Sequence, residues 1–311
     1  MATQAEILLQ NANFCDMLDS DGAMRKQAAD DASDFIRLKL REAGFTRKIL
    51  EPKEIAPSEY DQAVWTDKPI KIYPKETDIQ PALTVPYGVL PVHFYIRPSK
   101  FIVHPQRILS PRVFKDKMEL RTYRYDVKQV FTDNMVKDLQ AAEDRALLAG
   151  VNTAMIAANT AMPYSGVAQW KQISGGFSRT SVVRGSLQVM QQTPFNIPAE
   201  TCLVNNITWS EHFAWGRDEA GGDYSEKTLT QGWKVTKLLG LEWLITLKRG
   251  LVGNLTQYMF GPQKFLGKSC LFTPPTMYVD VKYWMYHFFA MEEIGTTLAH
   301  TGAFGRVDYL A

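Results

Sequence analysis

The sequence predicts an α+β fold in which one long helix joins an extended N-terminal region to a compact C-terminal half. Residues 126–149 carry one apolar stripe at helical spacing, and ten of the sixteen prolines fall within residues 52–111. After residue 179, segments with strand and helix patterns alternate along the chain. A long helix followed by such alternation is typical of α+β and mixed α/β proteins.

The composition excludes several classes of protein. The chain has 311 residues, of which 45% are apolar and 22% charged, enough for one large domain or two modest ones. These proportions exclude wholesale disorder, a collagen-like chain and a coiled coil. No run of roughly 18 uncharged apolar residues occurs, so we expect no transmembrane helix, and residues 1–10 lack the pattern of a secretory signal.

The three cysteines, Cys15, Cys202 and Cys270, are odd in number and far apart. Their spacing fits neither a disulfide framework nor a Cys-x-x-Cys metal site. A reducing compartment suits such a chain better than an oxidising one. Cys202 and Cys270 lie in apolar runs, so we expect both to be small buried hydrophobes rather than nucleophiles.

Charge is unevenly distributed along the chain. Residues 1–60 contain 8 basic and 11 acidic residues, a net charge of −3, whereas residues 61–125 contain 11 and 6, a net charge of +5. The total is only +2, less than a dedicated nucleic-acid binder usually carries. The asymmetry fits contact with a partner or a neighbouring copy, and two solvated faces would explain it equally well.

The first half of the chain is predicted to be helical and then extended. Residues 1–50 have helical spacing, with a cap at Asp19 to Asp21 and Gly44 as a stop. In residues 52–111 the prolines remove backbone donors and block helix formation, leaving short strand-like runs at 70–73, 92–96 and 101–103. Such a segment cannot form its own core, so we expect an arm or long hairpin that lies on something else.

The long helix is predicted between Asp126 as N-cap and Gly150 as C′ residue. Its 24 residues would span about 36 Å. Beyond it, a helix is predicted at 179–192 and a short helix at 208–215. The predicted strands lie at 201–204, 238–247, 258–260, 279–291 and 296–310.

No motif in the chain indicates catalysis or a cofactor. Neither phosphate-binding glycine loop occurs, nor does G-x-S-x-G. His287 and Glu293 would share one strand face, and we expect satisfied polar residues there rather than a metal site. Arg121 to Tyr125 alternates bases with aromatics, which could grip single-stranded nucleic acid but is better explained as an amphipathic strand.

The order of these elements resembles the major capsid proteins of tailed bacteriophages, which share the Hong Kong 97-type fold with encapsulins. The stretch from Val130-Phe131-Thr132-Asp133 through Gln140 to Gly150 is similar to the spine helix of that family. That helix commonly ends in a Glu-Asp-x-Ala-x-x-x-Gly-like run, here Glu143-Asp144-Arg145-Ala146-Leu147-Leu148-Ala149-Gly150. The similarity in order extends over nearly the whole chain.

The resemblance implies five regions. They are an N-terminal arm (1–60), an extended E-loop region (61–111), a peripheral domain with the spine helix at about 126–149 (112–178), an axial domain (179–276) and strands that return to the peripheral domain (277–311).

The resemblance also implies a function. It indicates a structural subunit, not an enzyme, of an icosahedral viral capsid that self-assembles into pentamers and hexamers around double-stranded DNA. It implies copies of itself as partners, non-specific contact with packaged DNA, and scaffold, portal and decoration proteins as further candidates, with no cofactor and no membrane. Such a protein is made in the host cytoplasm and resides in the virion. The alternatives are an encapsulin-like compartment shell, a soluble cytosolic enzyme using His287 and Glu293, and a single-stranded nucleic-acid binder.

Candidate inter-subunit contacts follow from the basic E-loop region. The sequence offers no catalytic, cofactor-binding or metal-binding residues. The contact candidates are Lys68, Lys71, Lys75, Arg97 and Arg107.

Overall fold

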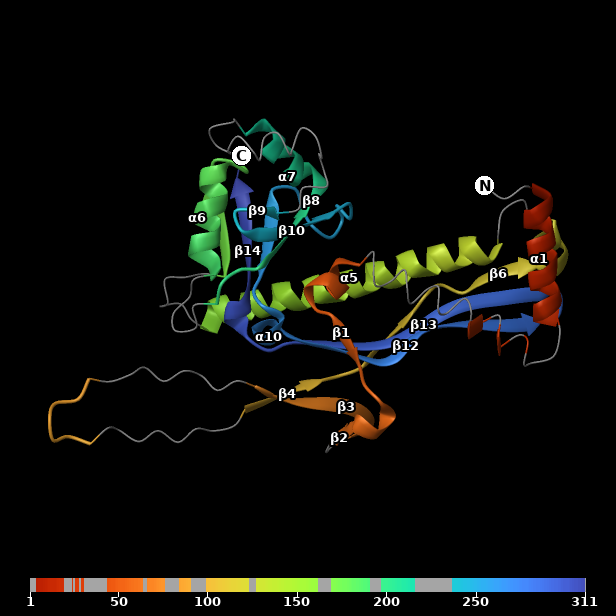
Figure 1. The fold of residues 1–311 in the computed structure, drawn as a ribbon, viewed down its shortest axis with the longest axis horizontal. Coiled ribbons are helices and arrows are strands. Elements are labelled where there is room, and N and C mark those ends of the chain that lie inside the picture. Colours follow the sequence, from red (N-terminus) through yellow and green to blue (C-terminus); the bar gives the residue numbers. More distant parts are fainter. Residues whose placement is uncertain are drawn as a thin grey trace. The chain divides into compact units, whose positions relative to one another are not determined.

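The computed structural model describes residues 4–19, 24, 26–27, 29–30, 44–63, 66–75, 84–90, 99–122, 127–161, 169–190, 197–215 and 237–310. The fold divides into two compact units, each built from three segments that are distant in sequence (Figure 1). The first unit comprises Met1–Lys71, Val103–Leu147 and Ser269–Thr296, and the second comprises Ile72–Ile102, Leu148–Lys268 and Thr297–Ala311.

The longest element is helix α5, Val127–Ala161, with 35 residues and a length of about 52 Å. The predicted helix is confirmed, but it continues past its predicted end at Gly150. The cause is that its apolar spacing persists, because Val151 and Met155 are fully buried one and two turns after Leu147. Gly150 is exposed, and a Cβ placed on it would meet no atom within 4 Å.

Replacing Gly150 with alanine should raise the free energy of unfolding by about 0.5–1 kcal/mol, because glycine weakens a helix interior. Urea unfolding followed by circular dichroism would measure the change. Gly176→Ala is the matched control: its Cβ would also meet nothing within 4 Å, but its φ is +60°, so alanine should destabilise the protein there. If Gly150→Ala instead destabilised the protein, the helix would end near Gly150 with that residue in a left-handed conformation, which would contradict a continuous α5.

The first unit contains a five-stranded sheet in the order β1-β12-β13-β5, with β6 also paired to β13. These strands are β1 Pro52–Glu54, β12 Gly267–Lys282, β13 Met285–Leu298, β5 Gln106–Leu109 and β6 Val113–Asp116. The single strand predicted over 279–291 is wrong: β12 ends at Lys282 and β13 begins at Met285, so the run is a hairpin with its turn at Tyr283 and Trp284. β1 pairs in parallel with β12, with Pro52 opposite Ser269.

The core of this unit lies between the sheet and three helices. Helix α1, Gln4–Asp19, and helix α4, Lys117–Arg121, pack together, and Figure 1 shows α1 beside the hairpin end of β12 and β13. Phe131 of α5 contacts Phe288 of β13 at a ring-centroid distance of 4.7 Å. Helix α1 ends at Asp19, where a helix start was predicted. The predicted helix over residues 24–40 lies largely outside the described residues.

A three-stranded sheet is made of β2 Asp61–Ala63, β3 Thr66–Lys75 and β4 Ser99–Val103. It confirms the predicted strands at 70–73 and 101–103, while the predicted run at 92–96 lies outside the described residues.

The second unit is built on a six-stranded sheet in the order β7-β14-β11-β8-β10-β9. Its strands are β7 Trp170–Ser174, β14 Phe304–Leu310, β11 Thr256–Phe260, β8 Thr201–Asn205, β10 Leu241–Thr246 and β9 Lys237–Leu238. The pairs β10–β8 and β14–β7 are parallel, and the other pairs are antiparallel. The sheet confirms the strands predicted near 201–204, 238–247 and 258–260.

Helices close this sheet. Helix α6, Arg179–Met190, packs on β14 and β7, and Gly185 permits the approach because a Cβ there would lie 3.2 Å from Val307. The short helix α7, Asn206–Ser210, is capped by Asn205, whose side chain accepts a hydrogen bond from the Thr208 amide. Trp209 and Trp243 are fully buried in the core beneath.

Candidate inter-subunit surfaces

Three of the five predicted contact residues, Lys68, Lys71 and Lys75, lie on strand β3. Lys68 is exposed. Lys71 is already engaged within the chain: its Nζ donates to the Glu59 carbonyl oxygen at 2.5 Å and lies 3.5 Å from the Asp61 carboxylate. The charge of Lys71 is therefore partly neutralised by a carboxylate of its own chain.

Arg107 of β5 is likewise paired. Its Nη2 lies 2.6 Å from Glu293 Oε1, and Thr273 donates a hydrogen bond to the other oxygen of the same carboxylate. The Arg107 hydrogen bond is the main cause that lowers the pKa of Glu293. Arg97 lies outside the described residues. The structure therefore engages two of the four described candidates within the chain and leaves Lys68 and Lys75 as the stronger ones.

The structure separates His287 and Glu293, the pair on which an enzyme reading depended. They stand six residues apart on β13, so about 20 Å separates them along the strand. His287 contacts the Phe114 ring at 5.9 Å, and Glu293 bonds to Arg107. These two side chains do not form one site.

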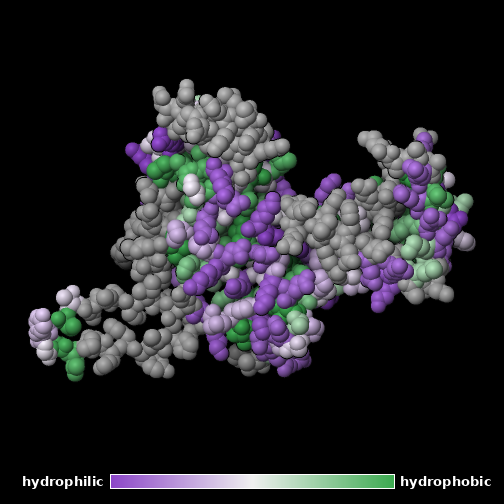
Figure 2. All heavy atoms as spheres, viewed as in Figure 1, coloured by the Kyte–Doolittle hydropathy of each residue, from purple (hydrophilic) through white to green (hydrophobic). Residues whose placement is uncertain are grey.

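Residues 84–90 form an apolar turn in the predicted E-loop region. The Val89 amide donates to the Pro86 carbonyl oxygen at 3.2 Å, and Gly88 has a φ of +86°, which a type II turn requires at this position. Tyr87 is fully exposed and Leu90 is 82% exposed. Figure 2 shows green, apolar atoms at this segment. Apolar side chains gathered in water are typical of a surface that a partner covers.

A second exposed apolar group lies at the turn between β12 and β13. Tyr283 is 88% and Trp284 76% exposed, and Phe114 and Met118 nearby in the fold are also exposed. The Lys117 amide donates to the Trp284 carbonyl oxygen at 2.9 Å, which ties α4 to this turn. Tyr283 has a φ of +55°, a conformation that costs free energy in a bulky residue and often marks a functional position.

A buried ionic cluster joins three elements of the first unit. Helix α3, Phe45–Ile49, carries Arg47, whose Nη2 lies 2.5 Å from Glu143 Oε1 on α5 and 2.9 Å from Glu292 Oε2 on β13. Beside it, the Thr46 amide and hydroxyl both donate to Asp144 Oδ1, at 3.0 and 2.7 Å. The Glu143-Asp144 pair that resembles the family's spine helix therefore holds α3, a segment within the predicted N-terminal arm (1–60).

The charges in this cluster do not balance. One guanidinium lies between two buried carboxylates, since Glu143 and Glu292 are 3% and 0% exposed. Burial is the main cause that raises the pKa of Glu292 to about 9, and the charge and hydrogen bond of Glu143 add to it, while Arg47 opposes it. The carboxyl group of Glu292 therefore keeps its proton at neutral pH.

The raised pKa of Glu292 predicts how the free energy of unfolding depends on pH. The unfolded chain releases the Glu292 proton above the usual carboxyl pKa of 4.5, whereas the folded protein holds it to about 9, so the free energy of unfolding should fall as pH rises between these values. Glu292→Gln removes the titrating group and should flatten that fall. Urea midpoints of variant and wild type, measured from pH 5 to 9, would test this.

The matched control for this prediction is the neighbouring residue. Glu293→Gln removes a carboxyl whose pKa is lowered, so it should leave the fall above pH 5 in place. Parallel curves for Glu292→Gln and wild type would contradict the assignment of the proton to Glu292.

Burial raises the pKa of the Cys202 thiol to about 12, so it is not a thiolate at neutral pH. Among the described residues, no cluster of His, Cys, Asp or Glu side chains could hold a metal ion. No helix in the described part of the chain is both long and apolar enough to cross a membrane.

No family model matches the sequence, and no curated protein is significantly similar to it. Solved structures are similar to it. The capsid of cyanophage P-SCSP1u aligns with a TM-score of 0.54 and 11% identity, covering 78% of this chain and 83% of that chain. The mature capsid of bacteriophage PhiM1 aligns at 0.55 and 8%, covering 86% and 87%. The chain has the Hong Kong 97-type capsid fold.

This capsid fold is not restricted to phages among the solved structures. A virus-like particle from Pyrococcus furiosus aligns with a TM-score of 0.51 and 11% identity, covering 89% of this chain and 98% of that chain. At these identities the likeness establishes the fold, and it confirms the α+β prediction and the resemblance. The boundaries of the five predicted regions stay a prediction.

Proposed function

We propose that the chain is the structural subunit of an icosahedral viral capsid, without catalytic activity, that assembles into pentamers and hexamers around double-stranded DNA. The observation that carries this proposal is the likeness to phage capsid chains over most of the length of both. The virion is then its site of action and the host cytoplasm its site of synthesis. Portal, scaffold and decoration proteins are its candidate partners besides its own copies.

The exposed surfaces support the proposal. The turn at residues 84–90 and the Tyr283–Trp284 turn each expose apolar side chains that folding within one chain does not bury. Contact with neighbouring copies would remove this area from water, as large obligate interfaces do. Lys68 and Lys75 are proposed to meet acidic side chains of a neighbour and to aid its register.

The size of the purified full-length protein tests the proposal. Light scattering and negative-stain electron microscopy should show closed shells, or rings of five or six subunits. Tyr87→Ser combined with Leu90→Ser should reduce assembly while leaving the urea midpoint of the subunit unchanged, because these side chains touch solvent only. Leu247→Ser is the control, since Leu247 is 78% exposed but lies outside this turn. A stable monomer under all salt and crowding conditions would contradict the proposal.

A second candidate function is the shell of a protein compartment that encloses other proteins. The likeness to the Pyrococcus furiosus particle favours it, because it covers 98% of that chain. Nuclease-resistant DNA inside purified particles would support the capsid, and co-purifying cargo protein without DNA would support the compartment.

A further inference from the structure

A pocket of about 160 Å³ lies in the second unit between strand ends and helix α10, Gln263–Leu266. Its walls are tied together by hydrogen bonds. The Ala299 amide donates to the Leu266 carbonyl oxygen at 2.9 Å, and the Thr297 hydroxyl donates to the Ile102 carbonyl oxygen at 3.1 Å. The pocket is therefore part of the folded unit rather than a gap between mobile segments.

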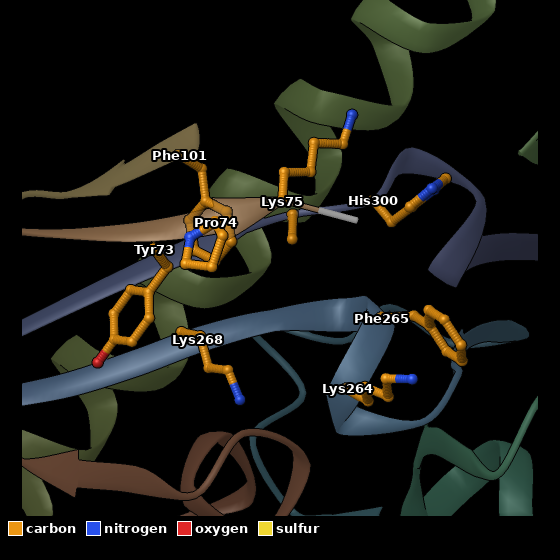
Figure 3. Close-up of a pocket in the computed structure, with 9 residues that line it drawn as sticks. Tyr73, Pro74, Lys75, Phe101, Lys264, Phe265, Lys268 and His300 are labelled. Carbon is orange, nitrogen blue, oxygen red and sulfur yellow. The ribbon is translucent and has the colours of Figure 1, made fainter. Parts of the chain in front are cut away.

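Aromatic rings form much of the lining. Tyr73 and Phe101 stack with their ring centroids 5.7 Å apart and their planes 25° from parallel. Figure 3 shows these two rings on one side of the pocket and the rings of Phe265 and His300 on the other. A cavity of about 150 Å³ with apolar walls holds one benzene ring, so this pocket has room for a single six-membered ring.

Cationic side chains surround the aromatic lining. Lys75, Lys264 and Lys268 contribute to the pocket, and no aspartate or glutamate is among the described residues that line it. Their chains extend outward around the rings in Figure 3, and Lys264 Nζ lies 5.2 Å from the Phe265 centroid. In the described part of the chain, no ion pair joins these three lysines to a carboxylate. Lys264 and Lys268 extend toward the same side in Figure 3, whereas Lys75 points the other way, and two ammonium groups on one side favour a ligand with more than one negative charge.

We propose that this pocket binds a pyrimidine nucleotide, with the ring between the aromatic side chains and the phosphate on Lys264 and Lys268. Stacking on aromatic side chains and phosphate contacts from lysine are the two interactions by which proteins hold unpaired nucleotides. A phosphate ester carries the double charge that a single carboxylate lacks. The volume selects one ring, so a purine should fit less well. The proposal does not depend on assembly, because all of these residues belong to one unit of one chain.

Equilibrium dialysis of the full-length protein against radiolabelled thymidine monophosphate tests this inference. Thymidine, inorganic phosphate and guanosine monophosphate serve as competitors, and each should compete at least about tenfold more weakly, because each lacks the charge, the ring or the size. Phosphate that competes as well as thymidine monophosphate would overturn the proposal, because it would show a site for any anion. Equal competition by guanosine monophosphate would overturn the choice of a pyrimidine.

Substitutions inside and outside the pocket test whether the nucleotide binds there. Lys268→Gln should weaken binding about fivefold or more, and Phe101→Leu should weaken it while circular dichroism and the urea midpoint show an intact fold. Lys237→Gln is the control, since Lys237 is an exposed lysine on β9 that does not line the pocket. Wild-type affinity in Lys268→Gln would overturn the assignment, even if Phe101→Leu failed to fold.

One further arm distinguishes the source of the nucleotide. An oligothymidylate of eight residues that displaces thymidine monophosphate at lower concentration would identify a strand of nucleic acid as the ligand. Displacement by free nucleotide alone would identify a small-molecule site. Failure of both to bind would overturn the proposal whatever the particle measurements show.

Discussion

Replacing Arg47 with methionine is expected to lower the free energy of unfolding by about 3–5 kcal/mol, one of the two largest effects that we predict. The variant keeps an unbranched apolar side chain but removes the only cation bonded to Glu143 and Glu292 in the described part of the chain. Both carboxyl groups would then remain buried beside each other without a positive charge. Urea unfolding of the subunit, followed by circular dichroism, measures the loss.

The control for Arg47→Met is the same substitution in an exposed pair. Arg107 also binds a glutamate on β13 at 2.6 Å, but its side chain is 62% exposed. Solvent screens such a pair, so Arg107→Met should cost less than about 1 kcal/mol. Equal losses in the two variants would show that burial does not set the strength of the Arg47 cluster.

Gly267→Ala should destabilise the protein by about 3 kcal/mol or more, because both the backbone and the space around it exclude a side chain. Gly267 has a φ of +156°, and a Cβ there would lie 2.1 Å from the backbone oxygen of Thr297. To remove this clash between the alanine Cβ and Thr297, the start of β12 would have to move away from the end of β13. The midpoint of urea unfolding would report the loss.

Gly250→Ala is the comparison for Gly267→Ala. Gly250 has no atom within 4 Å of its Cβ position, so alanine should change stability by less than about 0.5 kcal/mol. If Gly267→Ala unfolds at the wild-type midpoint, the close approach between Gly267 and Thr297 does not exist in solution.

The order of helices and strands in the fold could be read from the sequence because it is a local property. The apolar stripe of α5 predicts a helix and the short apolar runs of β8 and β11 predict buried strands, and the structure contains each element. The ends of helices were harder to predict. A glycine such as Gly150 commonly follows the last turn of a helix, but the buried Val151 and Met155 continue the apolar face beyond it. Tertiary burial thus overrode a local signal.

The side-chain contacts at the candidate inter-subunit surfaces could not be predicted from the sequence. The sequence indicated a basic segment, but only the fold shows that Lys71 and Arg107 turn to partners in their own chain. The Arg47 cluster was missed because its members are 96 and 245 residues apart. Its one sequence signal was the adjacent acidic pair Glu143-Asp144 within an otherwise apolar helix face.

The parallel pairing of β1 with β12 determines when the chain can finish folding. Pro52 pairs with Ser269, so a strand made early in synthesis must wait for one that is made much later. Contacts of such sequence separation slow folding, and the nascent chain exposes the unfilled strand edge and apolar core meanwhile. The first unit therefore cannot complete its sheet until Ser269–Thr296 has been synthesised. Every newly made copy thus passes through an interval in which it is prone to aggregate.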